Sequence, residues 1–476
     1  MFNDVEHLNE IHTEEFRDRI NTVDEHGNRK WIYAQKPKGK FYNIRTLLSI
    51  FYFVIFFGTP FIEVGDRPLF LFNIPSAKFI LFGKIFWPQD FFIFGLTMVS
   101  FIFFIFLFTA AFGRLFCGWA CPQTNFMEMM FRKIEYWVLG DAPAQKQLSK
   151  SPWNTNKIFR YSLKHILFYL LSFVIANFFL SYIIGMKEVI KIAEDPLSEH
   201  IVGFFSLLIF SGVFYGVYAF FREQACIVVC PYGRLQGVLM DRNSMIVAYD
   251  YKRGEPRGNA KKKQAEGITT GDCIDCHQCV RVCPTGIDIR NGVQMECVGC
   301  TACIDACNGI MDKIGKPRGL IRYASENSIA NGERLHYTDR MKLYTLVLAI
   351  LLGVLSTLLI TRKDVDVTIM RTPGMLYQEV GKDSISNLYN LKAVNKTLHD
   401  VPLTIKLEGI NGRIETIGNS YIRIVKEGQG SGSFFIVLPK SVIKERSSHL
   451  KIGLYEGDKR IGSTKTNFLG PIAIEE

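Results

Sequence analysis

Long apolar blocks alternate with polar segments over most of the chain. Five blocks have the length of a membrane-crossing helix, which needs roughly 20 residues. They span residues 44–63, 91–112, 163–185, 201–220 and 341–360, and we predict a transmembrane helix for each. Prolines and lysines interrupt the apolar stretch 68–87, which predicts a re-entrant or interfacial loop instead of a sixth span.

The pattern changes after Thr361 to short runs rich in β-branched and aromatic residues, separated by Gly, Pro, Asn and Asp. About seven such runs over roughly 110 residues predict an Ig-like β-sandwich. No constellation of His, Ser or acidic residues stands out in this part. We therefore expect it to serve interactions outside the membrane. The runs are DVTIM, NLYNLKAVN, LTIKLEG, YIRIV, SFFIVLP, LKIGLYEG and STKTNFL.

The hydrophobic content of 48%, with 39 Phe, exceeds what a soluble protein of 476 residues needs. The formal charge of +11 comes largely from Lys and Arg beside the spans, in the N-terminal arm and in segments 113–162 and 221–340, whereas 186–200 is acid-rich. This asymmetry predicts an inside N-terminus and an outside C-terminus. The basic residues form no stripe with aromatics, which disfavours nucleic-acid binding. The charged first forty residues predict an uncleaved anchor instead of a signal peptide.

All 12 Cys lie in the segments that are predicted to be inside. Thiols persist in reducing compartments, so this distribution favours metal or redox chemistry over disulfides. Eight of them occupy residues 271–309 as two CxxCxxCxxxC runs, the pattern of bacterial two-cluster ferredoxins, in which the fourth Cys of each run serves the other cluster. The pattern predicts two [4Fe–4S] clusters, one held by Cys273, Cys276, Cys279 and Cys307, the other by Cys297, Cys300, Cys303 and Cys283.

Paired knuckles of structural zinc are the alternative, and two continuous runs of four Cys fit them poorly. Pro284 follows the first run, whereas Asn308 follows the second, which affects only the local turn. Because the ligands interleave, the two clusters must lie close together. The segment is therefore predicted to conduct electrons.

The other four Cys form two CxxxCP motifs, one after the second apolar block and one after the fourth. Spacing i, i+4 places each pair on one side of a helix, and the following proline frees backbone groups where the bilayer ends. Four converging thiols would select Cu(I), an iron–sulfur centre or zinc. The alternative is that they are small buried hydrophobes. These four membrane-end thiols are Cys117, Cys121, Cys226 and Cys230.

Other side chains could contribute, each with a plainer alternative. His165 could be a ligand at the same depth, although a hydrogen-bonded interface histidine is favoured. Met127, Met129 and Met130 could offer thioethers to copper, although packing is favoured. Lys261 to Lys263 and Arg281 could steer an acidic electron donor, although a solvated basic face is favoured.

The predicted fold class is a multi-domain membrane protein. It combines an α-helical transmembrane bundle with an inserted dicluster ferredoxin domain and a C-terminal all-β Ig-like sandwich. The predicted parts are a cytoplasmic arm at 1–43, a four-span domain at 44–220, a cytoplasmic segment at 221–340 with its ferredoxin core at 265–325, a fifth helix at 341–360 and a periplasmic domain at 361–476.

The chain resembles the cytochrome c oxidase accessory proteins of the CcoG/FixG/RdxA type, bacterial membrane polyferredoxins. The likeness extends over nearly the whole chain and rests on this order of parts: NRKWIYAQKPKGKFYNIRT, CGWACPQT, CIVVCPYGRLQ, the eight-Cys core, MDKIGKPRGLIRYAS and the sandwich. It implies an inner-membrane homodimer that reduces Cu(II) to Cu(I) on the cytoplasmic side for maturation of a cbb-type haem–copper oxidase. It also implies that the membrane-end thiols form the copper site.

We therefore expect an oxidoreductase with cupric reductase activity. Its expected partners are a cytoplasmic electron donor, a copper chaperone or exporter and oxidase subunits. One rival is a quinol-linked electron-transfer subunit that serves an outer reductase. Another is a non-enzymatic assembly scaffold whose clusters are structural.

Overall fold

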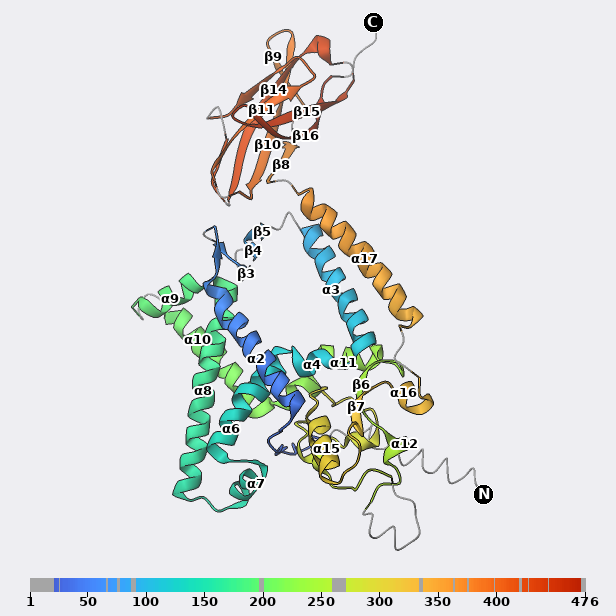
Figure 1. The fold of residues 1–476 in the computed structure, drawn as a ribbon. Helices are drawn as coiled ribbons and strands as arrows, with labels where there is room; N and C mark the ends of the chain where they lie inside the picture. The colour runs from blue at the N-terminus through green and yellow to red at the C-terminus, as the bar shows by residue number, and fades with distance from the viewer. Residues whose placement is uncertain are drawn as a thin grey trace. The chain divides into compact units, whose positions relative to one another are not determined.

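The computed structural model describes residues 21–24, 26–65, 67–74, 78–86, 91–196, 201–258, 271–333, 337–362, 364–374, 376–397, 399–418, 422–426, 428–443 and 445–471. The chain divides into two compact units. The first, the helical unit, comprises residues 1–62, 71–73 and 94–355, and the second, the sandwich unit, comprises 63–70, 74–93 and 356–476. Figure 1 gives the element labels.

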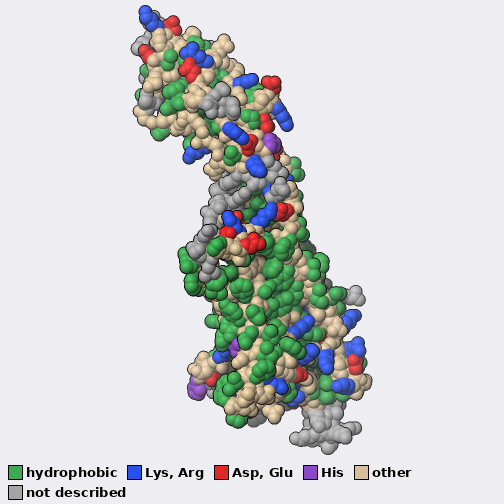
Figure 2. Space-filling view, turned by 90° about the vertical axis from the view of Figure 1, so that its left-hand side faces the viewer, with side chains coloured by type: hydrophobic (Ala, Val, Ile, Leu, Met, Phe, Trp, Pro, Cys, Tyr) green, Lys and Arg blue, Asp and Glu red, His purple; other side chains and the backbone are tan. Residues whose placement is uncertain are grey.

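Five helices in the described part of the chain are long and apolar enough to cross a membrane, as predicted. They are α2 (Lys40–Gly58, continued by a 3₁₀ turn to Phe61), α3 (Phe91–Phe112), α8 (Thr155–Ile184), α10 (Ile201–Gly216, continued by a π-helical turn to Phe221) and α17 (Asp339–Ile360). Large apolar side chains remain exposed along them, and Figure 2 shows such side chains gathered over this unit. Because this surface suits lipid, the chain is an integral membrane protein.

The third span begins at Thr155, earlier than the predicted residue 163, because polar residues extend the helix at its N-terminus. The Asn154 side chain caps it by accepting a hydrogen bond of 2.7 Å from the Lys157 amide. The remaining helices of this unit are α4 (Leu115–Trp119), α5 (Pro122–Phe126), α6 (Arg132–Leu139), α7 (Ala142–Lys150), α9 (Met186–Glu194), α11 (Pro231–Leu239), α12 (Tyr251–Gly254), α14 (Gln278–Arg281), α15 (Ala302–Lys313) and α16 (Glu326–Asn331).

The first span receives its N-terminal cap from the cysteine-rich segment. Gly39 precedes α2 and has no capping side chain, but Asp305 of α15 accepts hydrogen bonds from the amides of Phe41 (3.2 Å) and Tyr42 (2.8 Å). A carboxylate at a helix N-terminus also interacts favourably with the helix dipole. The cysteine-rich segment is thereby fixed to the end of the membrane helix. Two short strands, β6 (Ile246–Tyr249) and β7 (Ile321–Ala324), pair antiparallel and close this segment.

The C-terminal residues form the predicted Ig-like sandwich. One sheet has the order β12-β14-β10-β8, with β9 also paired to β10, and the other has the order β13-β11-β15-β16. The sequence did not reveal β9 or β12, which are short. The strands are β8 (Val365–Arg371), β9 (Gln378–Val380), β10 (Ser384–Asn395), β11 (Val401–Glu408), β12 (Arg413–Thr416), β13 (Ile422–Ile424), β14 (Gln429–Pro439), β15 (Ser447–Glu456) and β16 (Lys459–Leu469).

The interrupted stretch 68–87 forms no spanning helix in its described residues, as predicted, but the expectation of a loop was wrong. Short strands form instead, with Ile80 of β4 and Ile85 of β5 facing each other in register and both buried. Apolar residues that alternate across a pleat favour strands even where prolines prevent a helix. The strands are β1 (Glu63–Val64), β2 (Arg67–Pro68), β3 (Phe70–Asn73), β4 (Lys78–Leu81) and β5 (Lys84–Phe86).

Tyr389 lies in the sandwich core, where its side chain is fully buried and stacks on Phe434 at 5.6 Å between ring centroids. Its hydroxyl donates a hydrogen bond of 2.8 Å to the Asn467 carbonyl. We predict that Tyr389→Ala lowers the free energy of unfolding by about 3–5 kcal/mol, and that Tyr389→Phe, which loses the hydrogen bond alone, lowers it by about 1 kcal/mol. Urea-dependent proteolysis of residues 361–476 within the full chain measures both. The exposed Thr368→Ala is the control, and equal effects of all three changes would contradict this account.

Candidate metal centre

The two cysteine runs share a left-handed backbone at the two residues that flank their second Cys. In each run the residue before the second Cys has a left-handed backbone, at Asp275 (φ 57°) and Gly299 (φ 67°). The residue after the second Cys also has a left-handed backbone, at His277 (φ 54°) and Thr301 (φ 63°). Three of these four residues are not glycine, so each run accepts strain that persists only where surrounding structure enforces it. The repeat indicates that both loops are shaped around equivalent groups.

The structure brings the eight Cys of these runs together in two groups of four. In the first group, Cys279 and Cys307 lie within electrostatic range of each other, and both lie within range of Cys276. Cys307 also lies within range of Cys273. Burial, reinforced by the neighbouring thiols, raises the pKa of both Cys279 and Cys307 to about 12. This first cysteine group is the set predicted from the spacing.

The second cysteine group is Cys283, Cys297, Cys300 and Cys303. Burial is the main cause that raises the pKa of Cys297 to about 11 and of Cys300 to about 12, with Cys283 contributing to both shifts. The pKa of Cys303 is raised well above its usual value by burial and by the other three thiols, and Cys279 of the first group contributes as well. Thiols in two adjacent groups of four, half of them buried and half partly buried, fit two cubane clusters. The assignment of individual ligands stays a prediction.

The membrane-end thiols depart from the expected i, i+4 helix faces. Cys117 lies in α4, but this helix ends at Trp119, and Cys121 is the extended residue before Pro122. Cys230 is likewise extended before Pro231 (ψ 113°), after a π-helical turn that contains Cys226. The expectation of one helix face per pair was therefore wrong. The proline ring excludes the helical conformation for the residue before it, so each motif turns a corner between its two thiols.

All four membrane-end thiols nevertheless gather in one place. Cys117 lies within electrostatic range of Cys121 and Cys230, and Cys226 within range of the other three. Burial and the neighbouring thiols raise the pKa of Cys117 and of Cys226 to about 12. Cys117 and Cys226 also pack against an apolar cluster that includes Cys300 of the second cysteine group, and whose members are Val282, Val298, Cys300 and Ala302.

Two backbones meet where α4 contacts the second cysteine group. Gly118 is so close to the cysteine loop that a Cβ at this residue would lie 2.5 Å from the Gly299 carbonyl oxygen and 2.8 Å from that of Val298. Arg45 of α2 joins the two sides, because its Nε donates to the Gly118 carbonyl (2.9 Å) and its guanidinium to the Cys300 carbonyl (3.0 Å). Only 3% of Arg45 is exposed, so its bonds form away from water.

A second arginine joins both CxxxCP motifs to the cysteine loop. Arg114 donates to the carbonyls of Met295 and Gly233 and, at 3.5 Å, to that of Cys297. Nearby, the Trp119 indole donates a hydrogen bond of 2.9 Å to the Tyr323 hydroxyl. Cys117 Sγ donates to the Gln236 side-chain oxygen at 3.2 Å. Among the described residues, no three Cys, His, Asp or Glu side chains converge closely enough to hold a single metal ion.

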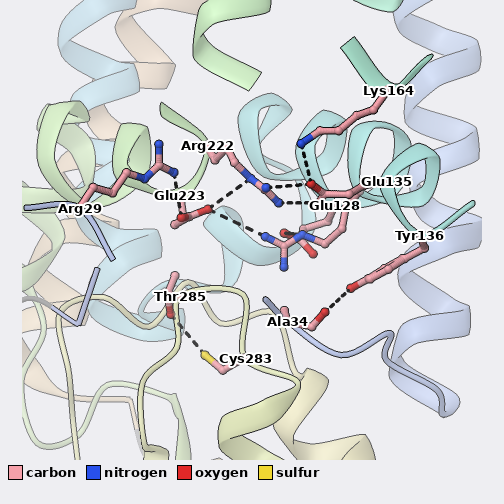
Figure 3. A network of polar contacts seen from close by, with 11 residues as sticks. Arg29, Ala34, Glu128, Glu135, Tyr136, Lys164, Arg222, Glu223, Cys283 and Thr285 are labelled. Atoms are coloured by element: carbon pink, nitrogen blue, oxygen red, sulfur yellow. Dashed lines mark hydrogen bonds and ion pairs between the residues drawn. The ribbon is translucent and has the colours of Figure 1, made fainter. Parts of the chain in front are cut away.

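A buried ion network lies beside the second CxxxCP motif (Figure 3). Glu135 of α6 accepts two hydrogen bonds from Arg222, at 3.1 and 2.9 Å, and pairs with Lys164 of α8 at 3.0 Å. Burial opposes its charge, but Arg222, Lys164 and Arg132 together lower the pKa of Glu135 from 4.5 to about 2. Arg222 has a left-handed backbone (φ 51°) and is followed by Glu223, which pairs with Arg29 at 3.2 Å. The network therefore holds a strained turn four residues before Cys226.

Neither this network nor the two arginines at the cysteine loop were predicted, because Arg45, Arg114, Arg132 and Arg222 count in the sequence only as basic residues beside spans. All four are buried. The one available signal was the presence of acidic residues among them, namely Glu128, Glu135 and Glu223.

The plainer alternatives hold for His165 and for the methionines. His165 Nδ1 forms a 2.8 Å hydrogen bond with the Tyr215 hydroxyl, and its ring stacks near Phe220. Met127 and Met130 belong to an apolar cluster around Phe131 and Phe168. Met129 is also buried. Lys261 to Lys263 lie outside the described residues. No observation tests whether Arg281 steers a donor.

Three family models match the chain. One described as a 4Fe-4S dicluster domain matches residues 221–326, and one described as a 4Fe-4S binding domain matches residues 94–139. The third, described as an IG-like fold at the C-terminal of FixG, matches residues 355–471. The chain therefore carries iron–sulfur binding domains.

Three bacterial proteins are similar over long segments. The nitrogen fixation protein FixG of Rhizobium meliloti is 36% identical over 63% of this chain, and the match covers 58% of FixG. Protein RdxA of Cereibacter sphaeroides is 33% identical over 82% of this chain and 84% of its own length. Protein RdxB of the same organism is 32% identical over 82% of this chain and 87% of its own length.

The contact at Gly118 gives a first prediction for this site. Gly118→Ala places a methyl group against two backbone carbonyls that cannot turn aside, so α4 must move away from the second cysteine group at a cost of about 1–3 kcal/mol. We expect iron to be lost to a chelator roughly tenfold faster, a ratio that corresponds to about 1.4 kcal/mol. Absorbance decay in anaerobic detergent solution measures this rate. Gly309→Ala, on α15 in open space, is the control, and equal decay in both variants would contradict the packing argument.

The Glu135 network gives a second prediction. Because its folded pKa is depressed, Glu135 contributes stability that is complete above pH 4.5 and is lost as pH falls toward about 2. Glu135→Gln leaves buried cations without their partner and should cost about 3–5 kcal/mol at pH 7. The free energy of unfolding of this variant should also change less between pH 4.5 and about pH 2 than that of the wild-type protein. Thermal unfolding of the helical unit against pH measures both effects, with the exposed Glu188→Gln as control. An unchanged pH profile would refute the assignment.

Proposed function

The chain belongs to the FixG/RdxA family of membrane iron–sulfur electron-transfer proteins, and on this premise we propose that it reduces Cu(II) to Cu(I). The observation that carries the proposal is the packing of Cys117 and Cys226 against the apolar cluster that contains Cys300 of the second cysteine group. Thiols in that position can bind a soft metal ion beside an electron source. The product would serve the assembly of a cbb-type haem–copper oxidase.

Clusters held by the two cysteine groups would each supply one electron when reduced. The membrane-end thiols bind the copper substrate. Because burial raises the pKa of Cys117 and Cys226 to about 12, copper must displace their protons as it binds. The partner of the Cys117 proton, the Gln236 amide oxygen, accepts a hydrogen bond but cannot take up the proton, so the proton leaves to solvent. The thiolates then retain Cu(I), which soft ligands prefer.

We propose a cytoplasmic electron donor, a copper chaperone or exporter as the recipient, and oxidase subunits as partners. We also propose that the protein acts as a homodimer in the bacterial inner membrane. In this arrangement the cysteine groups face the cytoplasm and the sandwich faces the periplasm.

A second candidate is that the membrane-end thiols hold a further iron–sulfur cluster that extends the electron path. The family model for a 4Fe-4S binding domain favours it, because residues 94–139 contain Cys117 and Cys121. Iron content separates the two candidates. Two cubanes bring about eight iron atoms per chain, and a third raises the number to about twelve.

The test replaces both thiols of the first motif. We predict that Cys117→Ser with Cys121→Ser lowers cuprous-ion formation by dithionite-reduced protein at least tenfold, with iron content and cluster absorbance unchanged. A colorimetric Cu(I) chelator follows the reaction under anaerobic conditions. Met127→Leu, in the apolar cluster nearby, is the control and should retain activity. A loss of about four iron atoms per chain would favour the third cluster, and full activity would refute both candidates.

A further inference from the structure

A cavity of about 460 Å³ lies where α3 and α17 approach the cysteine-rich part of the helical unit. The last turns of α3 contribute Phe104, Phe108 and Ala111 to its lining, and the start of α17 contributes Met341. Phe106 and Tyr344 contact each other at 6.3 Å between ring centroids, so the two helices are neighbours here. The cavity belongs to neither the cysteine groups nor the membrane-end thiols.

The walls of this cavity are apolar and continuous with the lipid-facing surface. Phe104 is 48% exposed, and few residues of either span are buried within the protein. A ligand that enters from this side must therefore be soluble in the bilayer. The volume lies within the range of roughly 300–1,000 Å³ that is typical of small-molecule sites.

The inner end of the cavity is polar. Asn243 lines it from the turn before β6, and its side-chain oxygen accepts a hydrogen bond of 2.8 Å from Asn327. The Asn243 amide donates to Asp241, whose side chain is 33% exposed. The neighbouring Met245 amide donates to the Ala111 carbonyl at 3.2 Å, which fixes the turn against α3. A ligand with an apolar tail and a polar head would find both environments here.

A second, smaller cavity lies beside the first, on the side of the second cysteine group. Phe112 and Met245 line both cavities. The second cavity extends to Cys297, a member of the second cysteine group, and to Tyr323. The side chains of Phe112 and Met245 therefore border both the larger cavity and the smaller one that reaches Cys297.

We propose that the larger cavity binds an isoprenoid quinol, which donates electrons to the clusters. A membrane phospholipid matches the apolar walls equally well, but it has no redox chemistry that would use the adjacent cysteine group. Oxidation breaks both O–H bonds of the quinol. Its two protons leave to water at the Asp241 turn, and clusters held by the two cysteine groups would take up its two electrons, one each. The inference rests on the proposed function, because the quinol would be the electron donor for the proposed copper reduction.

The test uses the full chain with its clusters in anaerobic lipid nanodiscs. Decylubiquinol is the reductant, Cu(II) with a Cu(I) chelator is the final acceptor, and a photoreactive azido-quinone maps the site by mass spectrometry. Ala111→Trp fills the cavity, and Leu107→Trp, also on its lining, is the second filling variant. Val354→Trp on the exposed face of α17 is the matched control.

We expect both filling variants to lower quinol-driven copper reduction and photolabelling of α3 and α17 at least tenfold. Copper reduction by protein that has been reduced with dithionite and then freed of dithionite should be unchanged. Labelling elsewhere, or equal rates in the filling variants and Val354→Trp, overturns the quinol site. If wild-type protein reduces copper after reduction with dithionite and removal of the excess, but not with quinol, the quinol site fails and the proposed function stands. If quinol reduces the clusters and no reductant yields Cu(I), the copper proposal fails and the quinol site stands.

Discussion

The absence of a side chain at Gly118 allows α4 to touch the loop of the second cysteine group, and the arrangement of the site depends on this contact. A methyl group there would meet the carbonyl oxygens of Val298 and Gly299. Arg45 then occupies the adjoining space and donates to carbonyls on both sides. Because Arg45 belongs to the first span, its hydrogen bonds hold α2, α4 and the cysteine loop in a fixed arrangement. The membrane-end thiols are thereby held against the cysteine groups.

Charged side chains support this contact from the other direction. The second CxxxCP motif follows a turn at Arg222 whose left-handed backbone is unfavourable for a residue with a Cβ. The buried pair with Glu135 compensates, and Lys164 and Arg132 add further positive charge around the same carboxylate. Trp31 of the N-terminal arm lies against the Arg222 guanidinium at 4.7 Å. The arm and two helices therefore fix the position of Cys226.

The sequence was sufficient for features that depend on period or spacing. The five spans follow from the lengths of apolar runs, and the grouping of the eight Cys follows from their interleaved spacing, because both are local properties. The corner between Cys117 and Cys121 was not predicted, although Pro122 contained the signal, since the i, i+4 rule was applied across a residue that proline forces out of the helix. The paired strands around Ile80 and Ile85 were missed because each is only a few residues long. The network around Glu135 depends on long-range packing that no local pattern encodes.

The proposed donor and acceptor differ in the number of electrons that they exchange. A quinol releases two electrons, whereas Cu(II) accepts one, so a protein that joins them must store one electron between two copper turnovers. The two cysteine groups suit this task, because clusters held by them would each accept one electron, and Cys303 lies within electrostatic range of Cys279 in the other group. The smaller cavity and the membrane-end thiols both reach the second cysteine group, at Cys297 and Cys300 respectively. Electrons would therefore enter and leave through the same cluster, and the first group would act as the reserve that separates a two-electron oxidation from two one-electron reductions.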